Sequence, residues 1–279
     1  MKAPAFHYAR PDTLDEALTL LAERGQGATV LAGGQSLLAM LNLRLTQPEL
    51  LIDINRIAEL GGIADHGEHI RIGALARHAE VIASPLVAQH APLVALAMPY
   101  VAHLAVRNRG TFGGSIALAD PAAELPACAV ALGATMVLRS VRGERRVAAE
   151  DFFTGLYSTA RAADELLVAV DLPKRPAARV AFRELSRRHG DFAMVGVAAC
   201  LEAGSLRLVV FGCESHARLA AHASAAAQGH DLADEGVRNS VAAALDADLD
   251  PSGTLSGRPD TKRELAQVLV RRALADLAE

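Results

Sequence analysis

A chain of 279 residues is long enough to form one large domain or two domains of roughly 150 residues each. Hydrophobic residues make up 51% and charged residues 22%, which excludes a disordered, collagen-like or coiled-coil protein. The 28 Lys and Arg residues against 32 Asp and Glu leave a net charge of -4, so the overall charge does not favour binding to nucleic acid or to an anionic membrane. No apolar stretch reaches the roughly 20 residues that span a bilayer and no apolar signal core begins the chain, which predicts a soluble, cytoplasmic protein.

The N-terminal segment predicts a helix followed by short strands. Residues 13–16 have the spacing of a capping box, and apolar residues then recur at helical intervals from Leu14 to Leu21. In order, the segment predicts a helix that ends at Gly25, a strand at 28–31, a glycine turn at 33–36, a mostly apolar stretch at 37–45 and a second strand at 50–54.

The middle of the chain alternates strand and helix patterns. Its expected elements are a hairpin around 65–67, a helix at 80–97, a glycine-bearing stretch at 107–115, a helix at 123–132, a strand at 135–139 with a turn at 142–144, and a strand at 166–172. Pro85 and Pro92 interrupt the first helix, and each is compatible with the first turn of a helix. Gly133 ends the second helix, and Pro173 ends the last strand.

The strongest candidate for a linker lies at residues 174–177, where two cations and Pro176, together with Pro173 just before them, interrupt both periodicities. We therefore place a domain boundary there, between a domain at 1–174 and one at 175–279. The second domain is expected to contain strands at 193–201 and 206–211 joined by a hairpin at 202–205, then helices at 216–228, at 235–245 and from Lys262 onward. The predicted fold class is α+β.

Cysteine and histidine do not form a metal-binding pattern. Cys128, Cys200 and Cys213 stand far apart in apolar surroundings without a Cys-x-x-Cys pair, which excludes an iron–sulfur or zinc site with four thiolates from this chain alone. They are expected to be buried free thiols. The ten histidines show no recognisable ligand spacing, so no metal site is predicted.

Two glycine turns are the main chemical signal in the sequence. Residues 31–38 read LAGGQSLL and residues 109–115 read RGTFGGS, so each turn joins two adjacent glycines to a nearby hydroxyl. Adjacent glycines permit positive φ and let successive N–H groups approach an anion, and a hydroxyl adds a rotatable donor. The two turns could therefore hold a pyrophosphate from both sides. The alternative, that both are tight turns chosen only for backbone geometry, remains open.

Other nucleotide and nucleophile motifs are absent from the sequence. Neither turn matches the Rossmann pattern Gly-x-Gly-x-x-Gly, and no P-loop occurs. There is no Gly-x-Ser-x-Gly elbow, and neither Ser36 nor Ser115 has a histidine beside it, so a catalytic serine is not predicted. These absences favour a different nucleotide-binding fold, with the hydroxyls as phosphate ligands.

A set of motifs in fixed order resembles the FAD-binding medium subunit of the molybdenum hydroxylases, the family that includes xanthine dehydrogenase and aerobic carbon monoxide dehydrogenase. The motifs are LAGGQSLL at 31–38, LNLRL at 41–45, LIDINR at 51–56, RNRGTFGGSIALA at 107–119, DPAAELP at 120–126, FRELSRRHGDFAMVGVA at 182–198 and RELAQVLVRRAL at 263–274. The resemblance runs from about Phe6 to the end of the chain. Ala39 and Leu118 depart from it, since the family often has proline and histidine there.

The resemblance implies an FAD-binding domain of the vanillyl-alcohol-oxidase (PCMH) type, divided into α+β subdomains at about 1–57 and 58–174. It also implies a smaller α+β C-terminal domain at 175–279 with a three-stranded sheet and helices. The FAD is expected to lie extended between the two subdomains, with its pyrophosphate held by backbone amides of both turns and by the hydroxyls of Ser36 and Thr111.

The resemblance further implies a set of cofactor-binding residues. They are Leu31, Ala32, Gly33, Gly34, Gln35, Ser36, Leu37, Leu38, Val101, Thr111, Gly113, Gly114, Ser115, Glu124, Leu167 and Arg183. In the family, the position of Glu124 contacts the adenosine end of FAD, and those of Arg183 and of Leu166 or Leu167 lie near the flavin. The alternatives are that Glu124 only caps a helix dipole, that Val101 and the leucines are plain core, and that Arg183 belongs to a solvated ion pair.

The resemblance implies an electron-transfer subunit that carries FAD. In such a complex a molybdenum-cofactor large subunit oxidises the substrate, an iron–sulfur small subunit relays electrons to FAD, and the FAD passes them to NAD, a quinone or oxygen. Two of these three-subunit units are expected to form a heterohexamer, and no catalytic residue is required of this chain. Two other functions remain open: a stand-alone flavin-dependent reductase or oxidase with its own substrate pocket, and a scaffold that has lost its flavin.

Overall fold

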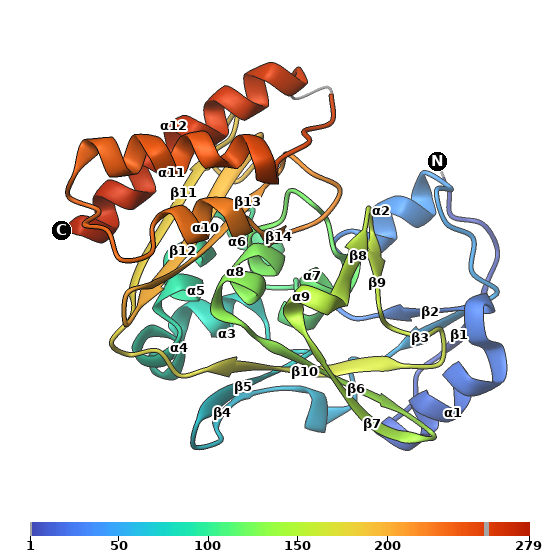
Figure 1. Ribbon diagram of the computed structural model, residues 1–279. Coiled ribbons are helices and arrows are strands. Elements are labelled where there is room, and N and C mark those ends of the chain that lie inside the picture. The colour runs from blue at the N-terminus through green and yellow to red at the C-terminus, as the bar shows by residue number, and fades with distance from the viewer. Residues whose placement is uncertain (1, 254–256) are drawn as a thin grey trace.

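The computed structural model describes residues 2–253 and 257–279, which form four β-sheets with helices packed between and around them (Figure 1). Separate sheets and helices of this kind confirm a fold of mixed helix and strand. Three short 3₁₀ turns link the larger elements, at Gly25–Gly27, Ala58–Leu60 and Met98–Tyr100. Of the described helices, none is long and apolar enough to cross a membrane.

The N-terminal segment forms a three-stranded parallel sheet in the order β1-β3-β2. Its elements are β1 (His7–Ala9), α1 (Leu14–Arg24), β2 (Ala28–Leu31), α2 (Leu37–Asn42) and β3 (Leu50–Asp53). Helix α1 begins as predicted, because the Thr13 side chain accepts a hydrogen bond from Glu16 N, and it buries its predicted apolar face. Strand β1 and helix α2 were not predicted, since three and six residues are too short for a periodic signal.

A five-stranded antiparallel sheet in the order β4-β5-β10-β6-β7 follows. Its strands are β4 (Ile63–Asp65), β5 (His69–Gly73), β6 (Thr135–Ser140), β7 (Gly143–Ala148) and β10 (Leu166–Pro173). The predicted hairpin between β4 and β5 is confirmed: Gly67 has a φ of +77°, and its N–H donates to the Asp65 carboxylate over 2.8 Å. Glycine at this turn avoids the penalty that a side chain meets at positive φ.

Seven helices and a small hairpin in the described part of the chain connect these strands. They are α3 (His78–Ala83), α4 (Pro85–His90), α5 (Pro92–Ala97), α6 (Leu104–Arg107), α7 (Phe112–Leu118), α8 (Glu124–Leu132), α9 (Ala149–Phe152), β8 (Phe153–Gly155) and β9 (Ser158–Thr159). Pro85 and Pro92 each occupy the first turn of a helix, so the stretch predicted at 80–97 is divided into three helices. Gly133 ends α8 in the left-handed conformation, as predicted.

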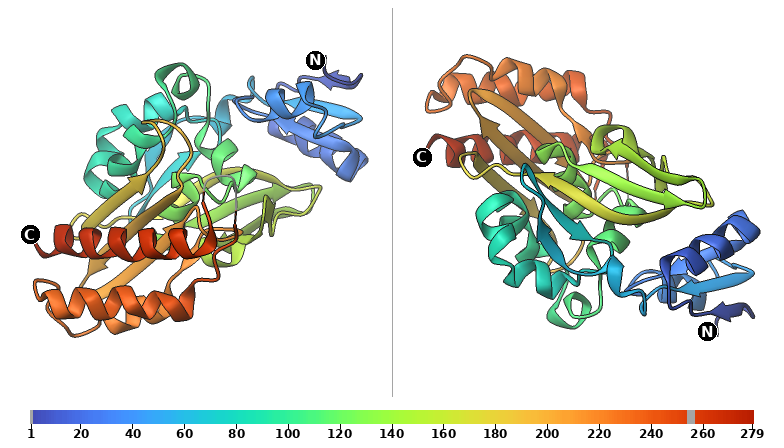
Figure 2. Two further views of the ribbon diagram at one scale, coloured as in Figure 1. Left: turned by 90° about the horizontal axis from the view of Figure 1, so that it is seen from above. Right: turned by 90° about the horizontal axis from the view of Figure 1, so that it is seen from below.

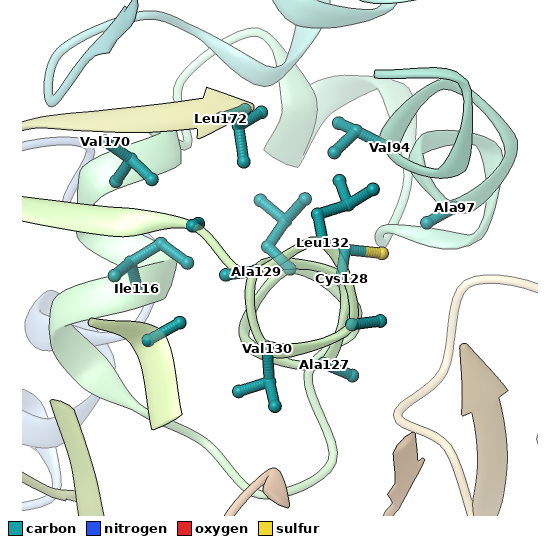
Figure 3. Close-up of a cluster of buried hydrophobic side chains, with 14 of the residues drawn as sticks. Val94, Ala97, Ile116, Ala127, Cys128, Ala129, Val130, Leu132, Val170 and Leu172 are labelled. Carbon is teal, nitrogen blue, oxygen red and sulfur yellow. The ribbon is translucent and has the colours of Figure 1, made fainter. Parts of the chain in front are cut away.

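Helix α8 is the centre of the largest core. All nine of its residues are buried, which is the pattern of a helix surrounded by other elements on every side. It packs against α5 and α7 of its own region and against the C-terminal strands β12 and β13. Figure 3 shows Val94 and Ala97 of α5 on one side of this helix and Ile116 of α7 on the other, with Cys128 among them. The three cysteines are free and buried, as predicted.

The C-terminal segment forms a four-stranded antiparallel sheet in the order β11-β12-β13-β14, covered by α11 and α12 (Figure 1). Its elements are β11 (Arg179–Leu185), β12 (Val195–Glu202), β13 (Ser205–Phe211), β14 (Arg218–Leu219), α10 (Ala221–Ala226), α11 (Glu235–Asp248) and α12 (Pro259–Ala278). The expected three-stranded sheet is therefore wrong by one strand. Residues 218–219 pair with β13 instead of extending the helix predicted at 216–228, because a two-residue strand depends on its partner and has no pattern of its own.

Each of the three larger sheets has apolar core next to it. In both views of Figure 2 the N-terminal segment lies at one side of the molecule and the helices α11 and α12 lie at the other. The first sheet buries Leu18 and Ile52, the five-stranded sheet buries Ile72 and Val170, and the last sheet buries Val197. A cavity lies between the first two of these regions, and it contains the candidate site.

Candidate functional site

A cavity of about 430 Å³ is lined by residues of the N-terminal segment, the five-stranded sheet region and the segment 190–192. This volume is within the range of pockets for small molecules and cofactors. The predicted residues that line it are Ala32, Gly33, Gly34, Gln35, Ser36, Leu37, Val101, Thr111, Gly113, Gly114, Ser115, Glu124 and Leu167. Residues far apart in the sequence thus meet around one space.

The first glycine turn presents free amide groups. Gly34 has a φ of +72°, the left-handed conformation that adjacent glycines permit. Among the described residues, none accepts a hydrogen bond from the backbone N–H of Gln35, Ser36 or Leu37; the first turn of α2 is closed by Leu38 N donating to Gly34 O and by Met40 N donating to Ser36 O. Unpaired N–H groups that line a cavity are ready donors for an anion.

The second turn is different, because the amides of residues 112–115 are already paired. Phe112 N donates to Ala76 O over 2.9 Å, and Gly113 N donates to Ala74 O over 3.0 Å. Gly114 N donates to the Thr111 hydroxyl oxygen, which caps α7, and Ser115 N donates to Thr111 O. The N–H groups of residues 112–115 thus bond to carbonyls of residues 74 and 76 and to Thr111, and the expected role of these amides at a pyrophosphate stays a prediction.

The two turns contact each other directly. A Cβ added to Gly33 would lie 2.5 Å from Arg109 O and 2.8 Å from the Cα of Gly110. Gly33 is therefore needed for the close approach of one backbone to the other, and not only for an approach to a ligand.

Two side chains that the sequence analysis missed connect the turns. Asn55 donates from Nδ2 to Ala32 O over 2.8 Å, and its Oδ1 accepts from Arg77 Nη2 over 2.7 Å. Arg77 in turn donates from Nη1 to the backbone oxygen of Arg109, the first residue of the second turn. The only available signal was the position of Asn55 directly after a predicted strand, which does not identify its partners.

Asp53 holds Asn55 in place. Burial opposes the charged form of this carboxylate, but hydrogen bonds from Tyr8 and from the Asn55 side chain and backbone outweigh that effect and lower its pKa. Asp53 is therefore ionised near neutral pH and accepts from the Tyr8 hydroxyl over 2.6 Å. The hydrogen bonds to this charged carboxylate hold the end of β3 in place next to the first turn.

His78 is a further residue in the cavity lining that the sequence analysis missed. It is 5% exposed, and a Cβ on Gly110 would lie 2.6 Å from its Cδ2. Burial, followed by the charges of Arg107 and Arg77, lowers the pKa of His78 to about 4. Its imidazole is therefore neutral near pH 7.

Glu124 lines the cavity from the first position of α8 and is 6% exposed. Burial raises the pKa of its carboxyl to about 7, with the charge of Asp120 adding to the effect. Asp120 also lines the cavity and accepts hydrogen bonds from Ala122 N and from the Tyr157 hydroxyl. Together these two acidic groups can accept hydrogen bonds from hydroxyl or amino groups of a ligand.

Three of the predicted residues do not line the cavity. Leu31 lies in β2 behind the turn, and the Leu38 side chain is half exposed. The Arg183 guanidinium donates from Nε to the Asp276 carboxylate of α12 over 2.6 Å, as the ion-pair alternative expected. Their roles at the cofactor stay predictions.

The geometry fits an extended dinucleotide. Free amides of the first turn and the hydroxyls of Ser36 and Thr111 lie in the cavity lining, and apolar Val101 and Leu167 lie there as well. Among the described residues, no group of three or more His, Cys, Asp or Glu is arranged to hold a metal ion. A cavity with apolar walls and a few convergent polar groups is typical of a cofactor site.

Comparison with known proteins identifies the chain. Residues 4–175 match the family described as the FAD binding domain in molybdopterin dehydrogenase, and residues 180–277 match the CO dehydrogenase flavoprotein C-terminal domain. Fold and site thus define an FAD-binding component of an oxidoreductase. The chain belongs to the family of FAD-binding medium subunits of the molybdenum hydroxylases.

Individual relatives cover almost the whole chain. The 6-hydroxypseudooxynicotine dehydrogenase complex subunit alpha of Paenarthrobacter nicotinovorans is 37% identical over 99% of this chain and 95% of its own length. A carbon monoxide dehydrogenase from Hydrogenophaga pseudoflava that lacks the Mo-pyranopterin moiety is 38% identical, with a TM-score of 0.95 over 99% of this chain and 98% of that one. Quinoline 2-oxidoreductase from Pseudomonas putida 86 is 37% identical, with a TM-score of 0.93 over 100% and 98%.

Proposed function

We propose that this chain takes electrons from an iron–sulfur small subunit of a molybdenum-containing dehydrogenase and passes them to an acceptor such as NAD, a quinone or oxygen. The observation that carries the proposal is the cavity between the N-terminal sheet and the five-stranded sheet, which gathers both glycine turns around one space. The described residues contain no cluster of cysteine ligands, so iron–sulfur chemistry is assigned to another chain.

The cofactor-binding residues are proposed to act in two groups. The N–H groups of Gln35, Ser36 and Leu37 would hold the pyrophosphate, with hydroxyl donors from Ser36 and Thr111, since these amides have no protein acceptor among the described residues. Glu124 would accept hydrogen bonds from the adenosine end, which its place in the cavity lining supports. Bound FAD supplies the redox chemistry, and the chain orients it and keeps water away from it.

We also propose how the chain is divided into domains. We place an FAD-binding domain of the vanillyl-alcohol-oxidase (PCMH) type at 1–174, with subdomains at about 1–57 and 58–174, and a C-terminal domain at 175–279. The two family matches, at 4–175 and 180–277, support a boundary near residue 175, and the division at 57/58 separates the three-stranded from the five-stranded sheet. The predicted cytoplasmic location stays a prediction.

The partners are proposed to be a molybdenum-cofactor large subunit and the iron–sulfur small subunit, in a heterohexamer of two three-subunit units. Names of relatives such as "dehydrogenase complex subunit alpha" and "medium chain" support an assembly with other chains. The large subunit would oxidise the substrate, so no catalytic acid or base is assigned here.

The test is purification of the chain with the products of the neighbouring genes. The expected result is a yellow complex that contains molybdenum, iron and one FAD per copy of this chain, and whose flavin is reduced when substrate is added. A chain that purifies alone and reduces or oxidises a small substrate by itself would support the stand-alone flavoenzyme instead. A colourless chain that cannot be loaded with FAD would support the scaffold.

A further inference from the structure

The loop between β9 and β10 contains a half-buried cation, Arg161, that no predicted function uses. Arg161 is half-buried and lines the cavity beside Leu166 and Leu167 at the start of β10. Among the described residues, no carboxylate forms an ion pair with it. Burial lowers the pKa of its guanidinium, with the charge of Glu165 acting in the opposite direction.

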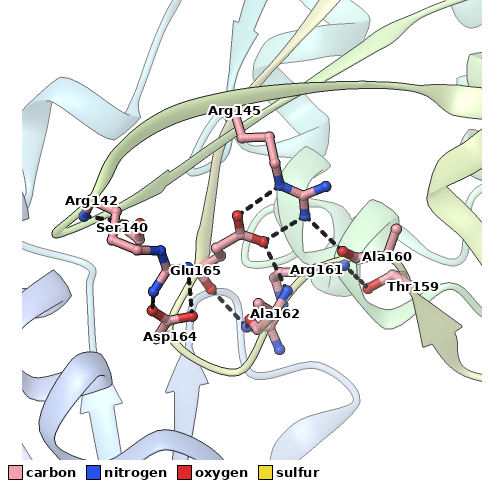
Figure 4. A network of polar contacts seen from close by, with 9 residues as sticks. All are labelled: Ser140, Arg142, Arg145, Thr159, Ala160, Arg161, Ala162, Asp164 and Glu165. Atoms are coloured by element: carbon pink, nitrogen blue, oxygen red, sulfur yellow. Dashed lines mark hydrogen bonds and ion pairs between the residues drawn. The ribbon is translucent and has the colours of Figure 1, made fainter.

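The guanidinium of Arg161 is fixed at one of its three nitrogens. Nη1 donates to Glu165 O over 2.7 Å and to Ala162 O over 3.1 Å, and both hydrogens of Nη1 are thereby used (Figure 4). The Nε–H group and the two Nη2–H groups have no acceptor among residues 2–253 and 257–279. Three donors of one planar cation are therefore left over, on a side chain that lines the cavity.

The surrounding loop is built to hold this arrangement. The Glu165 carboxylate is fully engaged by Arg145, through Nε at 2.8 Å and Nη2 at 2.7 Å, and by Ala162 N at 2.8 Å (Figure 4). Arg145 also donates to Ala160 O, and the backbone N–H of Arg161 donates to Thr159 Oγ1. Glu165 therefore accepts a hydrogen bond from Arg161 at its backbone carbonyl, while its carboxylate accepts hydrogen bonds from other groups.

The Nε and Nη2 atoms of Arg161 are not among the enclosed side-chain atoms that lack a partner, so they are open to the cavity and take acceptors from water or from a ligand there. FAD carries many suitable acceptors: diphosphate oxygens, adenine ring nitrogens, and the carbonyl oxygens and ring nitrogens of the flavin. Hydrogen bonds from a charged donor to such groups are about twice as strong as neutral ones.

We propose that Arg161 is a direct FAD ligand, which donates from Nε and Nη2 to acceptor atoms of the bound dinucleotide. The assignment rests on the proposed function, because it needs FAD in this cavity. It adds a cationic ligand to a site whose other predicted side chains are neutral or acidic, apart from Arg183, which pairs with Asp276.

The test compares FAD binding by the apoprotein of the full chain with that of Arg161→Met, by the quenching of flavin fluorescence on titration. Loss of charge-assisted hydrogen bonds is expected to raise the Kd for FAD by roughly 10- to 100-fold. Arg142→Met is the matched control, because Arg142 lies in the turn between β6 and β7 and pairs at the surface with Asp164 of the same loop as Arg161. Its Kd is expected to stay within about twofold of the wild-type value.

Two fragments of the cofactor locate the contact. FMN contains the flavin and one phosphate, and ADP contains the adenosine and the diphosphate. A penalty in Arg161→Met for FMN alone assigns the contact to the flavin half, and a penalty for ADP alone assigns it to the other half; either supports the proposal. Arg161→Lys, which keeps the charge but not the planar set of donors, should recover part of the affinity for FAD.

The outcomes separate this inference from the function on which it rests. If the wild-type apoprotein does not bind FAD, the proposed function and this inference both fail. If it binds FAD and both Arg161 variants bind it equally well, only the inference is overturned. Unfolding curves of the apoproteins show whether a weaker variant is still folded, and if Arg161→Met is not, Arg161→Lys decides.

Discussion

Gly33 and Gly110 lie so close together that a Cβ on the first would stand 2.8 Å from the Cα of the second. The contact joins the turn after β2 to the turn before α7, which are 77 residues apart in the sequence. The two turns are thus one structural unit, in which the first offers free amides and the amides of residues 112–115 in the second are bonded to protein acceptors. This asymmetry decides what substitutions in each turn should do.

Gly33→Val combined with Gly114→Val is expected to abolish FAD retention while the C-terminal domain stays folded. The valine at 33 must push against Arg109 O and Gly110, and the valine at 114 would stand 2.7 Å from the Thr111 hydroxyl oxygen. Flavin absorbance per mole of purified protein measures how much FAD is retained. We expect the Kd for FAD to rise by more than about tenfold, which corresponds to about 1.4 kcal/mol. Gly155→Val, where the nearest atom is 3.9 Å away, is the control. Unchanged flavin content in the double variant would contradict a site at these turns.

Asn55→Ala is expected to weaken FAD binding although Asn55 is not among the residues that line the cavity. The substitution removes the hydrogen bonds to Ala32 O and from Arg77, so the first turn loses its hydrogen-bonded link to Arg77 and keeps only the direct backbone contact with the second turn. Two lost hydrogen bonds of this kind correspond to roughly a tenfold rise in Kd. Flavin fluorescence titration of the apoprotein checks this, with the exposed Asn239→Ala as the control. Equal affinities for the two variants would show that the connection does not matter.

Thr111→Val is expected to lower the free energy of unfolding by about 1 to 2 kcal/mol. Valine keeps the shape of the side chain but leaves Gly114 N without its acceptor at the start of α7. Thr111→Ser keeps the hydroxyl and should lose less stability. Urea unfolding of the apoproteins measures the difference. If serine and valine cost the same, the cap contributes nothing and packing alone explains the burial of this residue.

The contribution of Glu124 to the stability of the apoprotein is expected to fall as the pH rises from about 4.5 to about 7, while His78, whose pKa burial lowers to about 4, acts in the opposite direction up to about pH 6.5. The pKa of Glu124 is about 7 in the folded chain against 4.5 ordinarily, so in this range the folded state binds the proton that the unfolded state has lost. At about 1.4 kcal/mol per pH unit, this group accounts for a decrease of about 3 kcal/mol that levels off above pH 7. Urea unfolding at several pH values measures it.

Glu124→Gln supplies the control for that pH dependence. The amide cannot ionise, so the difference in unfolding free energy between Glu124→Gln and the wild type should shift in favour of the variant by most of this amount across the same range, because His78 acts equally in both proteins. Glu184 also has a pKa raised by burial, to about 8, with the charge of Glu124 adding to the effect, so a part of the decrease should remain in the variant. Identical pH profiles for the two proteins would show that Glu124 ionises freely in the folded chain.

The sequence by itself determined those helices and turns that depend on neighbouring residues, and it indicated which kind of cofactor the site binds. The capping box at Thr13, the prolines at the start of α4 and α5, and Gly67 and Gly133 each act within a few neighbouring residues, so their patterns predict structure without knowledge of the fold. The motifs around both glycine turns were likewise sufficient to indicate the family and its cofactor.

Only the tertiary structure decided how these parts act together. The acceptors for Phe112 N and Gly113 N are carbonyls of Ala76 and Ala74, and the partners of Asn55 come from two other segments. Strands β1 and β14 exist because a neighbouring strand pairs with them, and Arg161 lines the cavity because of how its loop folds onto Glu165. Such contacts depend on chain packing across long separations, and a local pattern of residue types contains no information about which distant group becomes the partner.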